Sequence, residues 1–228
     1  MSGFDDLKTF DPQTLRNGYH FVILYGKVAS GKTVMLKDLM LNIFRSYHSV
    51  YLFSGSEDVK RDFLPFIGKK DRVLGGLDDP HSIMTINQLF KSQSSPIAGR
   101  CLLLFDDIIA LGNSQHNCPY LAKLATNYRH YKITVILATQ HMRAIPPTVR
   151  ANCSHAIIFR QINGDAIKAL VQEYLGGLIE MSNREKINFL NEVTSNYSTL
   201  VVINNSNIEY RTYKAEFSLS SLIRKLCR

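Results

Sequence analysis

The sequence predicts an α/β fold in which a mainly parallel central sheet is flanked by helices. Short apolar runs alternate with stretches in which apolar residues recur every three or four positions, which is typical of buried strands joined by amphipathic helices. One such run leads directly into a glycine-containing loop and then an amphipathic stretch, so this loop joins a strand to a helix. The predicted strands occupy residues 21–25, 49–54, 101–105, 133–138 and 155–160.

The connections between these strands contain the remaining predicted elements. After the glycine loop, the sequence "KTVMLKDLMLNIFRSY" carries apolar residues at helical spacing and predicts a helix. Near the C-terminus, two strand-like runs flank "NNSN" and predict a β-hairpin at the edge of the sheet. The final "SLSSLIRKLCR" is interpreted as a short basic helix or a loose tail.

Length and composition favour a single domain over residues 1–228, because 228 residues with 45% hydrophobic content suffice for one full core. We divide it into an N-terminal extension (1–19), a motif-bearing core (20–160) and a C-terminal part with helices, the hairpin and a basic tail (161–228). The longest apolar runs are far shorter than the roughly 20 residues of a membrane-spanning helix. We therefore expect no membrane-spanning segment and, because the N-terminus is acidic, no secretory signal.

Charge and cysteine usage narrow the expected setting. Lys and Arg outnumber Asp and Glu by 27 to 19, which fits either a polyanionic partner or a solvated basic surface. The 4 cysteines show no paired metal-ligand spacing, which argues against a zinc site and a disulfide framework. A reducing, intracellular setting is expected.

The stretch "GKVASGKT" predicts a phosphate-binding loop. In the pattern GxxxxGKT, successive backbone amides face phosphate oxygens, and the following helix offers its unpaired N-terminal amides. Lys32 is expected to reach the β- and γ-phosphates of ATP, and the Thr33 hydroxyl to coordinate Mg2+. The expected nucleotide contacts are Gly26, Lys27, Val28, Ala29, Ser30, Gly31, Lys32 and Thr33.

Two carboxylates follow the apolar run "CLLLF". Asp106 would hold the magnesium shell, and Asp107 would orient or deprotonate an attacking water. A solvated turn would also place acids after a strand, but the phosphate loop favours the functional interpretation. A second acid beside the magnesium ligand favours hydrolysis over phosphate transfer to a bound hydroxyl.

The strand that ends in "ILATQ" places Gln140 where the sheet would meet the γ-phosphate, so this amide could contact both the phosphate and the lytic water. Arg129 begins the same stretch at its opposite end. Because a strand rises about 3.3 Å per residue, Arg129 cannot easily reach a nucleotide at the far edge of its own sheet, but it could reach that of a neighbouring subunit. Among the other arginines, Arg150 is the strongest rival for this role.

Taken in order, "GKVASGKT", "LLLFDD", "YRHYKITVILATQ" and "IPPTVRAN" resemble the motifs of the FtsK and HerA superfamily of P-loop ATPases. Within it, the likeness is greatest to the poxvirus-type genome-packaging ATPases of large double-stranded DNA viruses. The resemblance covers roughly residues 20–160 and implies a P-loop NTPase (RecA/FtsK-like) fold that uses ATP and Mg2+. It also implies that Arg129 is a finger contributed to the adjacent subunit.

The same resemblance implies a function and partners. It implies an ATP-hydrolysing motor that translocates double-stranded DNA into a capsid as a homo-oligomeric ring, pentameric or hexameric, with capsid or portal-vertex proteins as partners. DNA binding would be independent of sequence, and the location would be the host cytoplasm at the viral factory or the virion. Asp107 departs from the Glu of many relatives, which leaves open whether it is the base itself.

Two other functions stay open from the residues. One is a nucleotide-gated assembly factor without motor activity, and the other is a small-molecule kinase, for which no acceptor-binding motif is visible. Two segments are candidate pore loops, "FIGKKDRVLGG" and "GNSQHNCPY".

Overall fold

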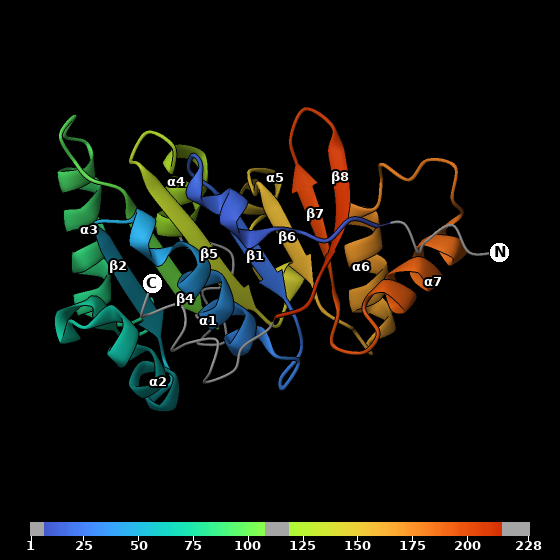
Figure 1. The fold of residues 1–228 in the computed structure, drawn as a ribbon, viewed down its shortest axis with the longest axis horizontal. Helices are drawn as coiled ribbons and strands as arrows, with labels where there is room; N and C mark the ends of the chain where they lie inside the picture. The colour runs from blue at the N-terminus through green and yellow to red at the C-terminus, as the bar shows by residue number, and fades with distance from the viewer. Residues whose placement is uncertain (1–6, 108–118, 216–228) are drawn as a thin grey trace.

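The computed structural model describes residues 7–107 and 119–215, and these form one eight-stranded sheet with strand order β3-β2-β4-β5-β1-β6-β7-β8 (Figure 1). Strands β1 to β6 are parallel, whereas β7 and β8 pair antiparallel at one edge. This confirms the predicted fold class, including the C-terminal hairpin. The strands are β1 (Phe21–Tyr25), β2 (Ser49–Ser54), β3 (Val73–Leu74), β4 (Cys101–Asp106), β5 (Ile133–Thr139), β6 (His155–Ile158), β7 (Thr199–Asn204) and β8 (Ile208–Tyr213).

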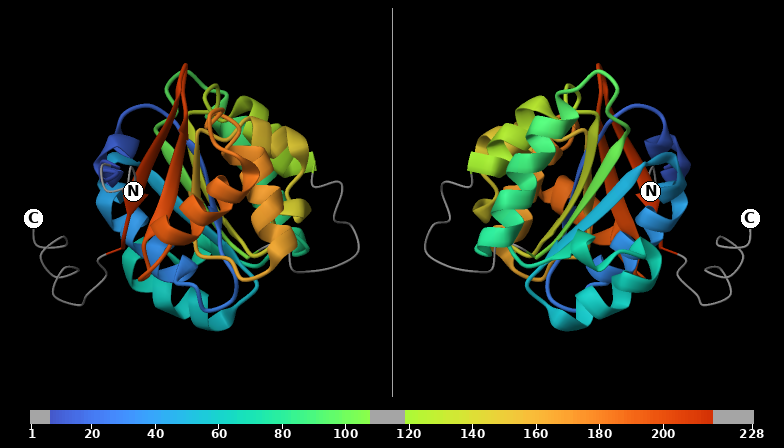
Figure 2. Two further views of the ribbon diagram at one scale, coloured as in Figure 1. Left: turned by 90° about the vertical axis from the view of Figure 1, so that its right-hand side faces the viewer. Right: turned by 90° about the vertical axis from the view of Figure 1, so that its left-hand side faces the viewer.

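Helices cover both faces of the sheet (Figure 2). On one face lie α1 (Lys32–Ile43) and α2 (Glu57–Ile67). The opposite face carries α3 (Pro80–Gln93), α4 (Pro119–Asn127), α5 (Pro147–Ala151), α6 (Gly164–Tyr174) and α7 (Asn183–Val193). Short 3-10 turns complete the described elements: η1 (Pro12–Arg16), η2 (Phe44–Ser46), η3 (Lys70–Arg72) and η4 (Met142–Ala144).

The two helical layers explain why the central strands are apolar without interruption. Side chains alternate between the faces of a strand, so a strand covered on both faces needs apolar residues at every position. In β1, Phe21 and Ile23 belong to the core beneath α3 to α7, whereas Val22 and Leu24 belong to the core beneath α1 and α2. All five residues of this strand are buried.

The observed strands differ from the predicted ones in several places. Strands β4 and β5 each extend one residue further than predicted, to Asp106 and Thr139. The predicted strand at 155–160 ends at Ile158, although the Phe159 amide still donates to the Tyr25 carbonyl of β1 (2.9 Å). Strand β3 was not predicted, since two residues beside β2 are too short to produce a recognisable alternation.

The N-terminal extension packs against the core where it is described. Phe10 and Leu15 are buried in the layer beside α1. A single parallel bridge joins Thr9 to Thr212, with a hydrogen bond from the Phe10 amide to the Thr212 carbonyl (2.8 Å). This segment therefore covers part of the exposed edge of β8.

Several predictions concern residues outside the described ranges. The terminal "SLSSLIRKLCR" lies there, as does most of the second candidate pore loop at 112–120. The first candidate, at 66–76, runs from the end of α2 through η3 and β3. Among the described residues, none of the helices has the length and apolar character needed to span a membrane.

Candidate nucleotide-binding site

The loop at residues 26–31 has a backbone that depends on glycine. At Gly26, an added Cβ would lie 2.3 Å from Ser30 Oγ and 3.0 Å from Lys32 Cγ, so a side chain there would close the loop. Gly31 has φ of 94°, a left-handed conformation that other residues rarely adopt. Ala29 is also left-handed, with φ of 59°. This alternation of backbone conformations turns successive amides to one side, which is the geometry of an anion-binding nest.

The loop and the start of α1 offer hydrogen-bond donors that could bind a phosphate group. The Ser30 hydroxyl oxygen is buried and has no hydrogen-bond partner among the residues that the structure describes. Helix α1 begins directly after Gly31, which as the N-cap residue has no side chain to cap the helix. An unpartnered hydroxyl and uncapped helical amides at one place need an acceptor such as a phosphate oxygen. The loop therefore fits the phosphates of a nucleotide.

Lys32 lies at the base of this loop with only 7% of its surface exposed. Its ammonium donates to the Lys27 carbonyl (2.8 Å) and thereby closes the loop. Burial lowers the pKa of Lys32, and the nearby carboxylates of Asp107 and Asp106 oppose this shift. A buried cation facing the loop is suited to bind an anion.

Asp106 is the last residue of β4 and faces α1. Its carboxylate accepts long hydrogen bonds of 3.5 Å from the hydroxyls of Thr33 and Ser54. The pKa of Asp106 is raised, first because the carboxyl is buried and second because Asp107 is close. The hydroxyl and carboxylate oxygens of Thr33 and Asp106 are the ligand type that Mg2+ prefers, so these residues fit the predicted ion.

Ser54 was not among the predicted site residues. It ends β2, which pairs with β4 so that Ser54 lies directly opposite Asp106. A polar residue at the end of an otherwise apolar strand-like run was the only signal in the sequence. Its position beside Asp106 depends on the order of the strands.

Asp107 and Gln140 meet at the same edge of the sheet. Gln140 follows β5 directly, and its side-chain amide donates a hydrogen bond to the Asp107 carboxylate. Asp107 has a left-handed backbone, with φ of 47°, and its amide donates to the Ala138 carbonyl. The two side chains thus hold each other in place, a contact that the sequence did not predict.

Arg129 lies at the opposite edge, but it does not start β5. The strand begins at Ile133, and Arg129 belongs to the turn between α4 and β5. Its Nε donates to the Tyr128 hydroxyl (3.1 Å), with the guanidinium over the Tyr128 ring and the residue exposed. Arg129 therefore lies at the opposite ends of the strands from Asp106, as the sequence predicts.

Arg150, the rival, is engaged within its own chain. It donates to the Ile145 carbonyl (2.6 Å) and forms an ion pair with Glu173 (3.2 Å). Its side chain is 15% exposed. Reaching a neighbouring subunit would require breaking these contacts, which makes Arg129 the better placed of the two.

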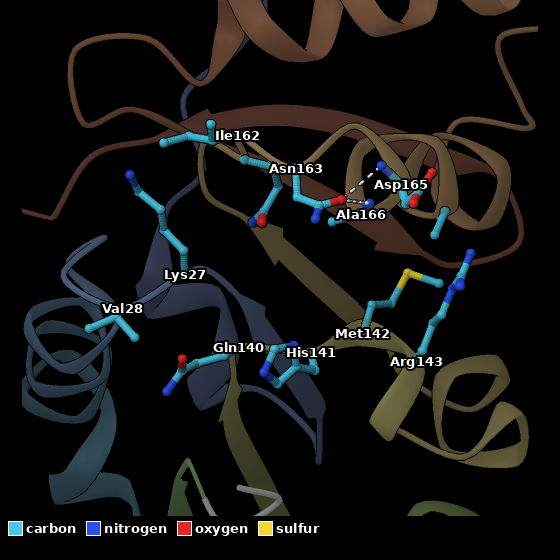
Figure 3. Close-up of a pocket in the computed structure, with 12 residues that line it drawn as sticks. Lys27, Val28, Gln140, His141, Met142, Arg143, Ile162, Asn163, Asp165 and Ala166 are labelled. Carbon is cyan, nitrogen blue, oxygen red and sulfur yellow. Dashed lines mark hydrogen bonds between the residues drawn. The ribbon is translucent and has the colours of Figure 1, made fainter.

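Two pockets flank the loop. The first, of about 580 Å³, lies between Lys27 and Val28 of the loop, the segment 140–143 after β5, and the start of α6 (Figure 3). Across it, Asn163 caps α6 by accepting from the amides of Asp165 and Ala166 (Figure 3). The second pocket, of about 430 Å³, lies on the other side of the loop.

The parallel sheet, the glycine loop between β1 and α1, and the acid at the end of β4 define a P-loop NTPase. The family model described as "Poxvirus A32 protein" matches residues 7–214, and the chain belongs to this family. The predicted resemblance to poxvirus-type ATPases is thereby confirmed.

Individual relatives are similar over most of the chain. The DNA packaging protein OPG160 of Vaccinia virus (strain Copenhagen) is 24% identical over 212 residues, covering 87% of this chain and 74% of the relative. The uncharacterized protein 088R of Invertebrate iridescent virus 3 is 26% identical over 190 residues, covering 80% of this chain and 69% of that protein.

Solved structures show the same fold. The genome packaging NTPase B204 of Sulfolobus turreted icosahedral virus 2, in complex with ATP-gammaS, superposes with a TM-score of 0.60 at 16% identity, covering 91% of this chain and 100% of that one. EssC (ATPases 2 and 3) from Geobacillus thermodenitrificans also gives 0.60, at 13% identity, with 92% and 43% covered.

Proposed function

We propose that this protein is an ATP-hydrolysing motor that translocates viral double-stranded DNA into the capsid during genome packaging. The observation that carries the proposal is the meeting of Lys32, Asp106 and Asp107 at one edge of the sheet. The P-loop, a magnesium-type acid and a second acid are the parts that hydrolysis requires. Family membership and the relatives named as DNA packaging proteins supply the link to DNA.

In this proposal the loop amides and Lys32 bind the β- and γ-phosphates of ATP. Thr33 and Asp106 hold a magnesium ion, which neutralises phosphate charge when bound. Asp107 orients the lytic water or accepts its proton, and Gln140 fixes the carboxylate through its amide hydrogen bond. Gln140 would then respond to the γ-phosphate in two ways, by contacting it directly and through its hydrogen bond to Asp107.

The proposed partner is the DNA backbone, because the chain carries a formal net charge of +8. Lys69 and Lys70, both exposed between α2 and β3, lie in the candidate pore loop at 66–76. A ring of five or six subunits around DNA, docked on capsid or portal-vertex proteins, completes the proposal. Its location would be the host cytoplasm, at the viral factory, or the virion.

The test is the rate of ATP hydrolysis by the wild-type protein with and without double-stranded DNA of unrelated sequences. We expect DNA to stimulate turnover and the affinity for DNA to fall steeply with salt, equally for each sequence. The Lys32→Ala variant should lose nucleotide binding or turnover. The matched control is Lys91→Ala, which removes an exposed lysine from α3, away from the loop.

Three results would contradict the proposal. ATP turnover that ignores DNA would favour the nucleotide-gated assembly factor. Conversion of ATP to ADP only in the presence of a small hydroxyl-bearing acceptor, with the phosphate recovered on that acceptor and not released, would favour a kinase. Full activity of the Lys32→Ala variant would contradict the assignment of residues 26–33 as the nucleotide-binding site.

A further inference from the structure

The second pocket beside the loop has no role in the proposed hydrolysis. Ala29 and Ser30 of the loop line it on one side. Phe159 and Arg160, which follow β6, and Tyr197, which precedes β7, line it on the others. The pocket therefore adjoins the phosphate site, and its lining residues outside the loop come from the segments 159–162 and 194–198.

The strand order determines what this pocket faces. The groups that mark the γ-phosphate end, Asp106 and Gln140, follow β4 and β5 on one side of β1. The second pocket lies at the end of β6 and the start of β7, on the other side of β1. A nucleoside triphosphate has its γ-phosphate at one end and its base at the other, so a γ-phosphate beside Asp106 directs the base towards this pocket.

The side chains at the pocket are of the kind that hold a base. Phe159 is 4% exposed, and its ring would lie 3.1 Å from a Cβ at Gly26, so it forms the floor directly beneath the loop. Arg160 donates to the Asn191 carbonyl (2.7 Å), which fixes its guanidinium beside the pocket. Aromatic rings and guanidinium planes are the usual stacking partners of bases.

Tyr197 is the most unusual of these residues. It is 78% exposed although it is a large aromatic side chain. Tyr197 and the preceding Asn196 both have left-handed backbones, with φ of 62° and 51°. Such a conformation is costly for a bulky residue and persists where the surroundings impose it. Here the two residues are the central pair of a tight turn from Ser195 to Ser198, which the Ser198 amide closes by donating to the Ser195 carbonyl (2.9 Å).

We propose that this pocket is the nucleobase subsite and that Tyr197 stacks on a purine base. The proposal rests on the nucleotide site described above and adds the residue that recognises the base. Since the exposed ring offers a stacking face and no fixed set of hydrogen bonds, we expect purine nucleotides to bind more tightly than pyrimidine nucleotides. ATP and GTP should differ less from each other than either does from CTP or UTP.

The test measures equilibrium binding of ATP and of inorganic tripolyphosphate, which lacks a base, so that it does not depend on turnover. Tyr197→Asn removes the ring and keeps a residue that tolerates the left-handed backbone. It should weaken ATP binding by about 5- to 150-fold and leave tripolyphosphate binding unchanged. Tyr197→Phe is the matched control, because it retains the stacking ring and should bind ATP like the wild type.

Each contrary result has a distinct meaning. Wild-type ATP affinity in Tyr197→Asn, or equal weakening of ATP and tripolyphosphate, would overturn the subsite while leaving the phosphate loop in place. Failure of the wild-type protein to bind either ligand would overturn the nucleotide site and the subsite together. Selective loss of ATP binding in a protein whose turnover ignores DNA would support the subsite and contradict only the motor.

Discussion

The two ends of the parallel strands each hold a charged residue, but the contacts around Asp106 and Arg100 differ. At the carboxyl edge, Asp106 receives only long hydrogen bonds of 3.5 Å from Thr33 and Ser54. At the amino edge, Arg100 donates to the carbonyls of Arg16 and Gly18 at 2.5 Å each. The Arg100 guanidinium also lies over the rings of Tyr19 and Tyr47.

This difference separates a group that is open to a ligand from a group that contacts within the chain already hold in position. Long contacts around a buried acid leave oxygen lone pairs available to a metal ion or a phosphate-bound water. Short contacts and ring stacking hold Arg100 in one place and leave it little freedom to bind anything else. Arg129 stands between the two cases, because it lies at the amino edge yet remains exposed, with a side-chain hydrogen bond of 3.1 Å to the Tyr128 hydroxyl.

The largest expected effect concerns Arg129. If an adjacent subunit presents it to the γ-phosphate, Arg129→Ala should lower ATP turnover by about 10³- to 10⁵-fold by removing charge neutralisation in the transition state. Mixing Arg129→Ala subunits with Lys32→Ala subunits should restore activity, since each variant retains what the other lacks. The measurement is the ATPase rate of mixed rings against each pure variant.

Arg61→Ala serves as the control, because Arg61 is exposed on α2 and pairs only loosely with Asp58 (3.4 Å). Full activity of Arg129→Ala, or no recovery in rings shown to be mixed, would contradict the assignment. Arg150 would then become the candidate, and its ion pair with Glu173 would have to open in the ring.

A smaller effect is expected at the carboxyl ends of the strands, where substitutions of Asp106 and Asp107 should affect different steps. Asp107→Asn should still bind MgATP but hydrolyse it about 10²- to 10⁴-fold more slowly, because the amide keeps the shape and loses the basic oxygen. Asparagine also tolerates the left-handed backbone at this position. Asp106→Ala should instead weaken the binding of MgATP. Equal loss of binding in both variants, measured by titration calorimetry, would show that the roles are wrongly divided.

The smallest expected effect concerns His155, at the start of β6, and tests whether a buried imidazole at the amino ends of the strands contributes to stability. Burial lowers the pKa of His155 to about 3, with a smaller contribution from His20, so the folded protein keeps this imidazole neutral. As the pH falls below the ordinary pKa of 6.5, the unfolded chain takes up a proton that the folded one does not. Stability is therefore present above this pH and is lost as the pH falls towards the folded pKa.

We expect the free energy of unfolding to fall by up to about 1.4 kcal/mol per pH unit through His155 below that point. Urea unfolding at several pH values should show this slope in the wild type and a shallower one in His155→Phe. Carboxylates contribute to both proteins alike, so the difference between them isolates His155. Identical slopes would mean that the imidazole is accessible to water in the folded state.

The sequence by itself determined five of the six parallel strands, all but the two-residue β3, and the phosphate loop. Each rests on residues that are close in the chain: a run of apolar residues for a strand buried on both faces, and GxxxxGKT for a loop whose backbone conformation Gly31 permits. Asp106 was identified for the same reason, because it ends an apolar run. Such local patterns carry their structural meaning without reference to the rest of the fold.

The tertiary structure alone decided which strand ends and loops meet. Ser54 and Asp106 are 52 residues apart in the chain, and Thr33 and Asp106 are 73 apart. Asp107 and Gln140 became partners, and Tyr197 came to line the same pocket as Ala29, for the same reason. Parallel strands are joined by crossovers, so their order depends on how the helices pack on the two faces of the sheet and not on distance along the chain.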